Sequence, residues 1–362
     1  MFLRKKQYVS SGSLSAQAWK RFRRDKLGFG SFIFIGIVFL IALLGYIVTP
    51  DSTPFVNDQY LEMGLKKPGY EAEFIRIPKM PHAERSGFFH RMIWGEKSPY
   101  NLYPVVDGGV DIYSQDGGYF KTSPGDYLAQ HPDATLVKRT YWLGTDRFGR
   151  DVFSMLVIGA RVSLSVGFIS VFISLVLGIL IGSIGGYFRG WLDNIIVWFI
   201  NVVWSIPTLL LVIAITFALG KGFWQVFVAV GLTMWVEVAR VVRGQILSLR
   251  EKEFVEAGKA LGFSSFRIIT RHLLPNVMGI VIVISAANFA AAILIEAGLS
   301  FLGMGVQPPI PSWGSMIKEN YGYIVLDYAY LAILPGIAIM LLVLAFMLIG
   351  NALRDALDVK TL

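Results

Sequence analysis

The chain has 362 residues, of which 54% are apolar and only 16% are charged. Soluble domains usually carry about 25% charged residues, so the composition excludes a protein that is soluble throughout. The formal net charge of +8 at pH 7 would suggest nucleic acid in a soluble protein, but in a membrane protein it reflects the excess of Lys and Arg in cytoplasmic loops.

Six apolar segments are long enough to cross a bilayer, which takes about 20 apolar residues in a helix. The first, at 27–48, exceeds the about 7–15 apolar residues of a signal peptide, and no A-x-A site follows it, so we expect a retained span. The sequence therefore predicts an all-α membrane protein with six transmembrane helices. The other five spans are expected at about 162–188, 194–219, 223–242, 277–302 and 328–348.

Basic residues predict the orientation of the spans, because short cytoplasmic loops are rich in Lys and Arg. They gather in the tail 1–26 and in the segment 243–271, whereas the connections on the other side hold only Lys221 and Lys318. We therefore expect a cell (inner) membrane protein with both tails, 1–26 and 351–362, in the cytoplasm. Six spans also require both ends of the chain to lie on the same side.

A hydrophilic stretch at 50–141 separates the first two spans, and the predicted orientation places it outside the cytoplasm. It is rich in Gly, Pro and aromatic residues, and disordered segments have few aromatics, so we expect a small folded insert. Alternating patches such as EAEFIRIPKM predict short strands. The stretch WLGTDRFGRDVF that follows predicts a helix capped by Thr145 or Asp146 and lying along the outer membrane surface.

Glycine and proline inside the spans have positional meaning. Gly178 and Gly182 form a G-x-x-x-G, which predicts close packing of helices in lipid rather than a mobile gate. Pro207 and Pro335 each remove a backbone hydrogen bond, which is tolerated where neighbours or a cavity satisfy the freed carbonyl.

Ionisable residues inside spans are candidates for function, because their burial is costly. Glu237 precedes Arg240 by three residues, so the two are expected to pair along one face of a helix. Glu296 has no partner within its own helix. It is expected either to pair across the bundle or to face water.

Enzymatic motifs are absent from the sequence. The four histidines lack metal-binding spacings such as H-E-x-x-H, and there is no cysteine to supply a thiolate. The sequence has neither a G-x-S-x-G elbow nor a G-x-x-x-x-G-K-[ST] phosphate loop. We therefore expect no catalytic, cofactor-binding or metal residues, and any ATP-driven work must draw its energy from another subunit.

The polar, basic segment 250–275 lies between two apolar spans. A helical pattern from Glu253 to Leu261 ends at Gly262, which suits the left-handed position just past a helix. Ser264 or Ser265 can cap a second helix, expected to end before Pro275. Flanking spans disfavour a DNA-binding helix-turn-helix. A short protruding helix tied to the bundle is better suited to dock in a groove on a partner.

This segment resembles the E-A-A-x3-G-x9-I-x-L-P loop of binding-protein-dependent ABC transporter permeases. Gly258 stands in place of the second alanine and His272 in place of the isoleucine. Three further stretches are similar to permeases for dipeptides, oligopeptides and nickel. They are WLGTDRFGRDVFSMLVIGARVSL from Trp142, EAGLSFLGMGVQPPIPSWGSMI from Glu296, and the C-terminal GNALRDALD. The permease core is expected at 142–350. The residues that match the coupling loop are Glu256, Ala257, Gly258, Gly262, Leu274 and Pro275.

The resemblance implies the fold of a type I ABC importer permease and a function in transport. A homologous second permease would complete the pathway, two cytoplasmic ABC ATPases would dock on the E-A-A-type helices, and an extracytoplasmic solute-binding protein would deliver the substrate. ATP and Mg would be bound by the ATPases, so this chain would carry no cofactor and bind no nucleic acid. Di- or oligopeptides are the expected cargo.

Several alternatives stay open at this stage. Nickel or another small solute could replace peptides. A channel or ion-driven secondary transporter should show more buried carboxylates or inverted repeats, and a membrane-anchored receptor would need neither six spans nor a coupling loop. The family often has an acidic residue where Asn201 stands. The candidates for the translocation path are Asn201, Trp204, Pro207 and Glu296.

Overall fold

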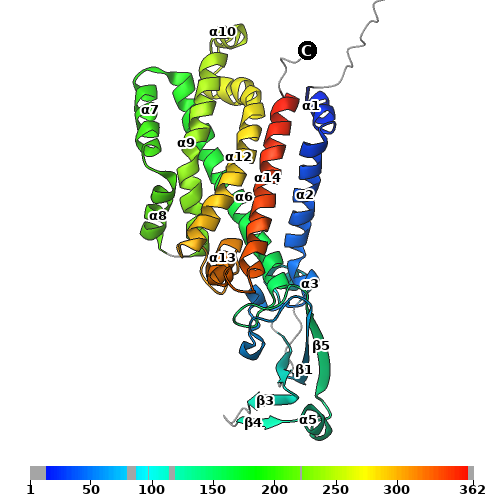
Figure 1. Ribbon diagram of the computed structural model, residues 1–362. Coiled ribbons are helices and arrows are strands. Elements are labelled where there is room, and N and C mark those ends of the chain that lie inside the picture. The colour runs from blue at the N-terminus through cyan, green and yellow to red at the C-terminus, as the bar shows by residue number, and fades with distance from the viewer. Residues whose placement is uncertain (1–13, 80–86, 97, 114–118, 221, 358–362) are drawn as a thin grey trace, which may run out of the picture.

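The computed structural model describes residues 14–79, 87–96, 98–113, 119–220 and 222–357. Most of these residues belong to helices that run side by side in one bundle (Figure 1). A small sheet lies beyond the end of the bundle that is opposite α1 (Leu14–Phe22) and α10 (Glu253–Ala260). The molecule thus has a helical body with a β-rich insert at one end.

Among the residues described, five helices are long and apolar enough to cross a membrane. They are α2 (Lys26–Leu43), α6 (Val152–Phe188), α9 (Phe223–Leu249), the helix Ser265–Phe301 that contains α12 (Leu274–Phe301), and α14 (Tyr330–Leu357). A sixth crossing is broken: α7 (Gly190–Trp204) and α8 (Thr208–Leu219) pass the same test together but meet at a bend of 92°. Five of the six predicted spans are therefore present as single helices, and the third corresponds to a pair of helices broken at Pro207, which has no amide hydrogen to continue the helix.

Close contact between α6 and α9 depends on glycine, as the G-x-x-x-G predicts. A Cβ atom added to Gly178 would lie 2.5 Å from Val238 Cβ, and one added to Gly182 would lie 2.5 Å from the Ala239 carbonyl oxygen. Gly186 lies one turn further along the same stripe, and a Cβ atom added there would lie 2.8 Å from the Arg243 carbonyl oxygen. Small residues let helix backbones approach closely in lipid, so the prediction of tight packing is confirmed.

The start of α6 differs from the sequence prediction. Its N-cap is Asp151, whose side chain accepts a hydrogen bond from the Ser154 amide at 3.1 Å. Thr145 and Asp146 are buried and bond to Lys66 and Arg150 instead. α6 then continues for 37 residues, because no proline interrupts it. The prediction of a separate surface helix capped by Thr145 or Asp146 is therefore wrong, and the apolar residues assigned to it form the first turns of α6.

The insert between α3 (Gly45–Val48) and α6 contains a five-stranded antiparallel sheet of order β4-β3-β2-β1-β5. The alternating patch EAEFIRIP lies in β1, between β2 and β5, where Phe74 and Ile75 are buried on opposite faces. β1 pairs with β5 from Tyr70 to Arg76, and β5 returns the chain to the bundle. The strands are β1 (Tyr70–Pro78), β2 (Tyr100–Val106), β3 (Gly109–Tyr113), β4 (Tyr119–Thr122) and β5 (Thr135–Tyr141), and the helices α4 (Phe88–Trp94) and α5 (Pro124–Gln130).

Candidate functional site

The predicted coupling segment forms a helical hairpin at the end of the bundle that carries α1. α10 ends in a left-handed residue, Gly262, whose φ is +77°. The Phe263 amide donates to the Gly258 carbonyl at 3.0 Å, and the Gly262 amide donates to the Lys259 carbonyl at 2.9 Å. This pair of bonds is the Schellman motif. Because nothing lies within 4 Å of a Cβ atom built on Gly262, backbone conformation rather than space requires glycine here.

The second half of the hairpin differs from the prediction at its far end. Ser264, rather than Ser265, caps α11 (Ser265–Ile268), accepting a hydrogen bond from the Arg267 amide at 3.4 Å. The helix does not stop before Pro275. It passes through a π-helical turn, Ile269–Leu273, and runs on as α12, with Leu274 half-buried and Pro275 exposed in its first turn. Proline has no amide hydrogen to donate, and the wider π-helical turn before it lets the helix continue without that bond. The prediction that the helix ends before Pro275 is therefore wrong.

One face of the hairpin is anchored and the other is bare. Val255 and Gly258 are buried against the bundle, while Glu256 and Ala257 are exposed. A Cβ atom on Gly258 would lie 3.4 Å from Phe263, an ordinary contact, so the alanine of the family would fit here. Sequence reasoning missed three large apolar side chains that solvent reaches on this hairpin: Phe254 (42% exposed), Leu261 (72%) and Phe266 (77%). The sequence signal that could have revealed them is the presence of large apolar residues outside the buried face of short amphipathic helices.

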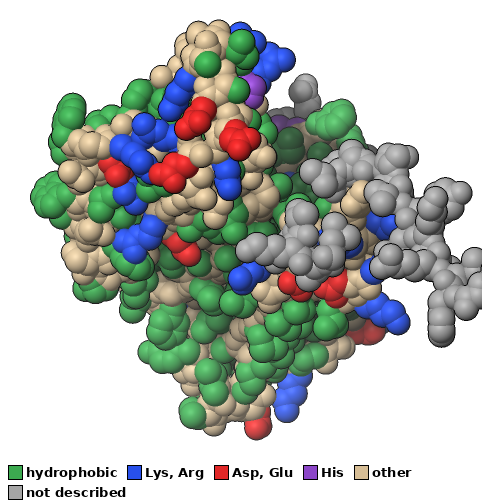
Figure 2. Space-filling model, turned by 90° about the horizontal axis from the view of Figure 1, so that it is seen from above, with side chains coloured by type: hydrophobic (Ala, Val, Ile, Leu, Met, Phe, Trp, Pro, Cys, Tyr) green, Lys and Arg blue, Asp and Glu red, His purple; other side chains and the backbone are tan. Residues whose placement is uncertain are grey.

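Ion pairs hold the base of the hairpin to its neighbours. Arg243 of α9 donates to both carboxylate oxygens of Asp193 on α7, at 2.5 and 2.7 Å. Arg189 pairs with Glu251 at 2.5 Å just before α10 begins. Figure 2 views this end of the molecule and shows Lys and Arg side chains spread over it, with Asp and Glu between them. A two-point Arg–carboxylate contact fixes geometry, so α7 and α9 are held together beside the base of the hairpin, and Glu251 joins that base to Arg189 at the start of α7.

Three of the predicted path residues lie near one another at the bend of the third span. Arg240 of α9 donates to the Asn201 side-chain oxygen at 3.2 Å and lies over the Trp204 ring at 3.5 Å from its centroid. Pro207 follows at the break between α7 and α8. The predicted Glu237–Arg240 pair is wrong: in the part of the chain described, no ion pair joins them, Arg240 turns to α7, and Glu237 is exposed.

Glu296 lies apart from this cluster and is fully buried on α12. It accepts a hydrogen bond from Ser300 at 2.6 Å, and Ser300 in turn contacts Ser312, the N-cap of α13 (Trp313–Asn320). Neither expected alternative holds, since Glu296 neither faces water nor meets a cation among the described residues. Its hydroxyl contacts join α12 to α13, which supports a structural rather than a path-lining role.

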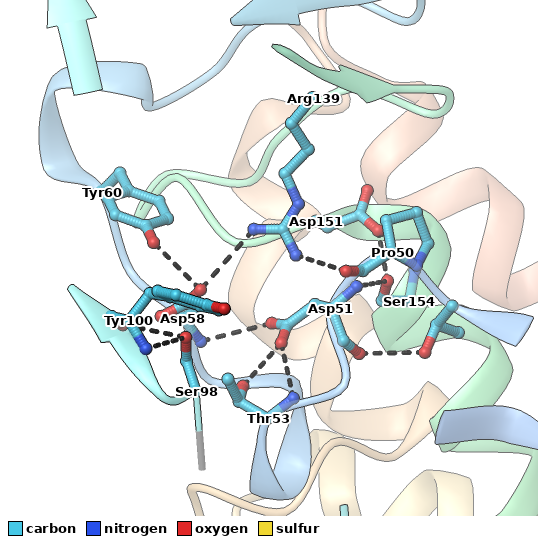
Figure 3. A network of polar contacts seen from close by, with 11 residues as sticks. Pro50, Asp51, Thr53, Asp58, Tyr60, Ser98, Tyr100, Arg139, Asp151 and Ser154 are labelled. Atoms are coloured by element: carbon cyan, nitrogen blue, oxygen red, sulfur yellow. Dashed lines mark hydrogen bonds and ion pairs between the residues drawn. The ribbon is translucent and has the colours of Figure 1, made fainter. Parts of the chain in front are cut away.

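A polar network joins the insert to the bundle (Figure 3). Arg139 of β5 donates to the Pro50 carbonyl at 2.7 Å and pairs with Asp58 at 3.6 Å. Asp51 accepts from the Thr53 hydroxyl at 2.6 Å and from the Asp58 amide at 3.3 Å, while its own amide donates to Ser154 of α6 at 3.2 Å. Contacts between residues so distant in sequence gave no sequence signal. They fix the sheet against α6.

Burial sets the protonation behaviour of this network. Desolvation raises the pKa of Asp51, and the Arg139 charge opposes that shift. Desolvation, together with the Asp58 charge, raises the pKa of Tyr60, whose hydroxyl donates to Asp58 at 2.9 Å. A buried carboxylate disfavours its charged form unless a cation lies near. The positive charge of Arg139 therefore stabilises the two neighbouring carboxylates, Asp51 and Asp58, at this junction.

Replacing Arg139 by alanine is expected to destabilise the junction by about 3 kcal/mol, because two poorly solvated carboxylates lose their cation. A carboxylate whose folded pKa is raised contributes stability below its unfolded pKa and loses it as pH rises through the folded pKa. Without Arg139 the pKa of Asp51 rises further, so the loss should be larger at pH 8 than at pH 5.

Thermal unfolding of the detergent-solubilised chain at the two pH values measures this effect. Lys138→Ala is the matched control, since Lys138 makes only an exposed pair with Glu73 at 3.2 Å, which is expected to contribute about 0–1 kcal/mol. Equal stability of the Arg139 and Lys138 variants at pH 8 would contradict the role of Arg139 in holding the insert to the bundle.

The helices and the hairpin define a multi-pass membrane protein with a helical hairpin that protrudes from one end. Comparison with known proteins identifies its family. Residues 174–361 match the model of the binding-protein-dependent transport system inner membrane component. Residues 13–68 match the N-terminal transmembrane domain of oligopeptide transport permease C. The chain belongs to the family of binding-protein-dependent transport system inner membrane components.

Curated relatives agree with this assignment. The dipeptide transport system permease protein DppC of Alkalihalophilus pseudofirmus is 41% identical over 242 residues, covering 67% of this chain and 77% of the relative. The glutathione transport system permease protein GsiD of Pectobacterium atrosepticum is 40% identical over 220 residues, covering 61% and 73%. Among solved structures, a chain of the inward-facing MetNI methionine ABC transporter matches 57% of this chain and 97% of its own length, with 20% identity and a TM-score of 0.48.

Family membership fixes several properties of the chain. It is a multi-pass transport subunit of an ABC importer rather than an enzyme, and the predicted type I permease fold is confirmed. An importer of this family works with ATPase and substrate-binding components. The channel, secondary-transporter and receptor alternatives are thereby set aside.

Proposed function

We propose that this chain is one of two related permease subunits of an ATP-driven importer of di- or oligopeptides. The observation that carries the proposal is the α10–Gly262–α11 hairpin, which protrudes from one end of the bundle with its apolar and acidic side chains exposed. Relatives named for dipeptides and for glutathione, itself a peptide, support peptide cargo, and nickel is not favoured.

The exposed polar cluster on α7 and α9 supports a second permease on that face. In a single chain, Glu237 and Arg240 would face hydrocarbon, where a charged side chain costs about 2.5–3.5 kcal/mol at the centre of a helix. A related subunit packed here, with a water-filled path between the two chains, removes that cost. Asn201, Trp204 and Pro207 then border the path, whereas Glu296 stays enclosed within this chain.

Coupling follows from the same geometry. One ABC ATPase docks on the hairpin of each permease, and the ATPases bind ATP and Mg. Phe254, Leu261 and Phe266 supply apolar contacts to the groove, and Glu256 supplies a charge. Because α11 runs without a break into α12, displacement of the hairpin is transmitted directly into a span. The solute-binding protein approaches from the side of the sheet.

Labelling of single cysteines tests the orientation on which this scheme depends, and the natural chain offers no background thiol. We expect Asp133→Cys, in the insert, to react with an impermeant maleimide added outside intact cells or spheroplasts. Ser264→Cys, in the hairpin, should react only after the membrane is opened; both positions are exposed. Labelling of Ser264→Cys from outside would reverse the orientation and remove the hairpin from the ATPases.

A further inference from the structure

Helix α4 of the insert exposes large apolar side chains that the fold does not use. Phe88 is 61% exposed, Phe89 74%, and Ile93 46%, and α4 contains no buried residue. At 100° per residue these three positions and Met92 share one face, while His90 and Arg91 lie on the other. A water-soluble insert gains nothing from such a face, so a partner must cover it.

The position of α4 is fixed by its C-terminal end. Arg161 of α6 donates to the Ile93 and Met92 carbonyls, each at 2.9 Å, and to the Leu43 carbonyl at 3.4 Å. The Glu96 amide just beyond α4 donates to the Ser52 carbonyl at 2.8 Å. The end of α4 is therefore held at the level of the last residues of α2.

At that level the long apolar helices of the first two spans end. α2 ends at Leu43, and the uninterrupted apolar part of α6 begins directly after Arg161. Beside Arg161, an apolar groove of about 570 Å³ opens on the outside of the bundle. Its walls include Phe39 and Phe168, which are 57% and 67% exposed. The lipid-facing surface of α2 and α6 thus continues to the clamp that holds α4.

We propose that α4 is an interfacial anchor that lies in the headgroup region of the bilayer on the side of the sheet, with Phe88, Phe89 and Ile93 directed into the lipid. Short amphipathic helices with Phe, Trp and Leu-type side chains on one face and basic residues on the other bind there, about 5–10 Å into the headgroup–acyl boundary. Trp94, 62% exposed, lies on the other face beside His90 and Arg91, and suits the headgroup side of this layer, where aromatic residues with a polar atom accumulate. The anchor holds the insert against the membrane beside the first two spans.

Collision of a spin label with apolar and polar quenchers tests this placement in the full-length chain. Single cysteines replace Phe89 on the apolar face and His90 on the other, and each labelled variant is reconstituted into phosphatidylcholine–phosphatidylglycerol vesicles. We expect the label at 89 to collide with oxygen, to be shielded from a water-soluble nickel complex, and to lie about 5–10 Å below the phosphates. The label at 90 should show the reverse preference.

Ile93→Cys provides a second reporter on the apolar face, so the test does not depend on one folded variant. Asp133→Cys, exposed on the insert away from α4, sets the value for full contact with water. Nickel accessibility at 89 and 93 equal to that at 133 would place α4 in water and overturn the anchor. Shielding from both quenchers would mean that protein, not lipid, covers the face, and would equally overturn it.

Discussion

Replacing Gly262 with valine is expected to abolish transport while the chain remains folded in the membrane. The left-handed conformation at this position, with φ of +77°, costs a branched residue roughly 1–2 kcal/mol, and the two bonds of the Schellman motif depend on it. The valine variant should relieve this strain by turning α10 away from its present direction. ATPase docking and peptide-dependent ATP hydrolysis then fall together.

The measurement is uptake of labelled peptide and ATP hydrolysis by the reconstituted importer at equal expression. Gly262→Asn is the matched control, because asparagine tolerates the left-handed region, and it should retain most of the activity. Glu256→Lys reverses a charge on the exposed face of α10 without touching the turn, and should weaken docking by a separate route. Normal transport by both Gly262→Val and Glu256→Lys would remove the coupling role of the hairpin.

Replacing Gly182 with valine is expected to force α6 and α9 apart and to destabilise the bundle. Even a single Cβ atom at this position lies 2.5 Å from the Ala239 carbonyl oxygen and 3.1 Å from Ala239 Cα, and backbone cannot rotate away as a side chain can. Overpacking usually costs about 1–3 kcal/mol, and the valine should fall at the upper end of that range.

Thermal unfolding of the detergent-solubilised chain measures the loss. Gly244→Ala is the control on the same pair of helices, since nothing lies within 4 Å of its added Cβ atom; it should be neutral or slightly stabilising. An unchanged unfolding temperature in Gly182→Val would mean that α6 and α9 do not depend on this close approach.

The features predicted from the sequence are those with a local cause. Length and hydropathy predicted the six spans, the G-x-x-x-G predicted the α6–α9 contact, and Gly262 predicted the turn of the hairpin. Each of these depends on residues close together in the chain, where periodicity and backbone preference decide the outcome.

The differences from prediction have two causes: a local π-helical turn before Pro275, and contacts between residues distant in sequence that override local preference. Pro275 does not end a helix, because a π-helical turn absorbs the missing amide and the span continues. Arg240 turns from Glu237 toward Asn201 and Trp204 on a neighbouring helix. Arg139 meets the Pro50 carbonyl across 89 positions of sequence, which no local pattern reveals. The contacts of the candidate site are therefore harder to predict from sequence than the fold class, because they depend on tertiary packing.

Peptide import driven by ATP is the central property proposed for this chain. The direct measurement is accumulation of a radiolabelled di- or tripeptide in proteoliposomes that hold this chain, its second permease and the ATPases, with the solute-binding protein outside and ATP inside. We predict that accumulation requires this chain, hydrolysable ATP and the binding protein together. Peptide accumulation without ATP, driven by an ion gradient through this chain alone, would contradict the account.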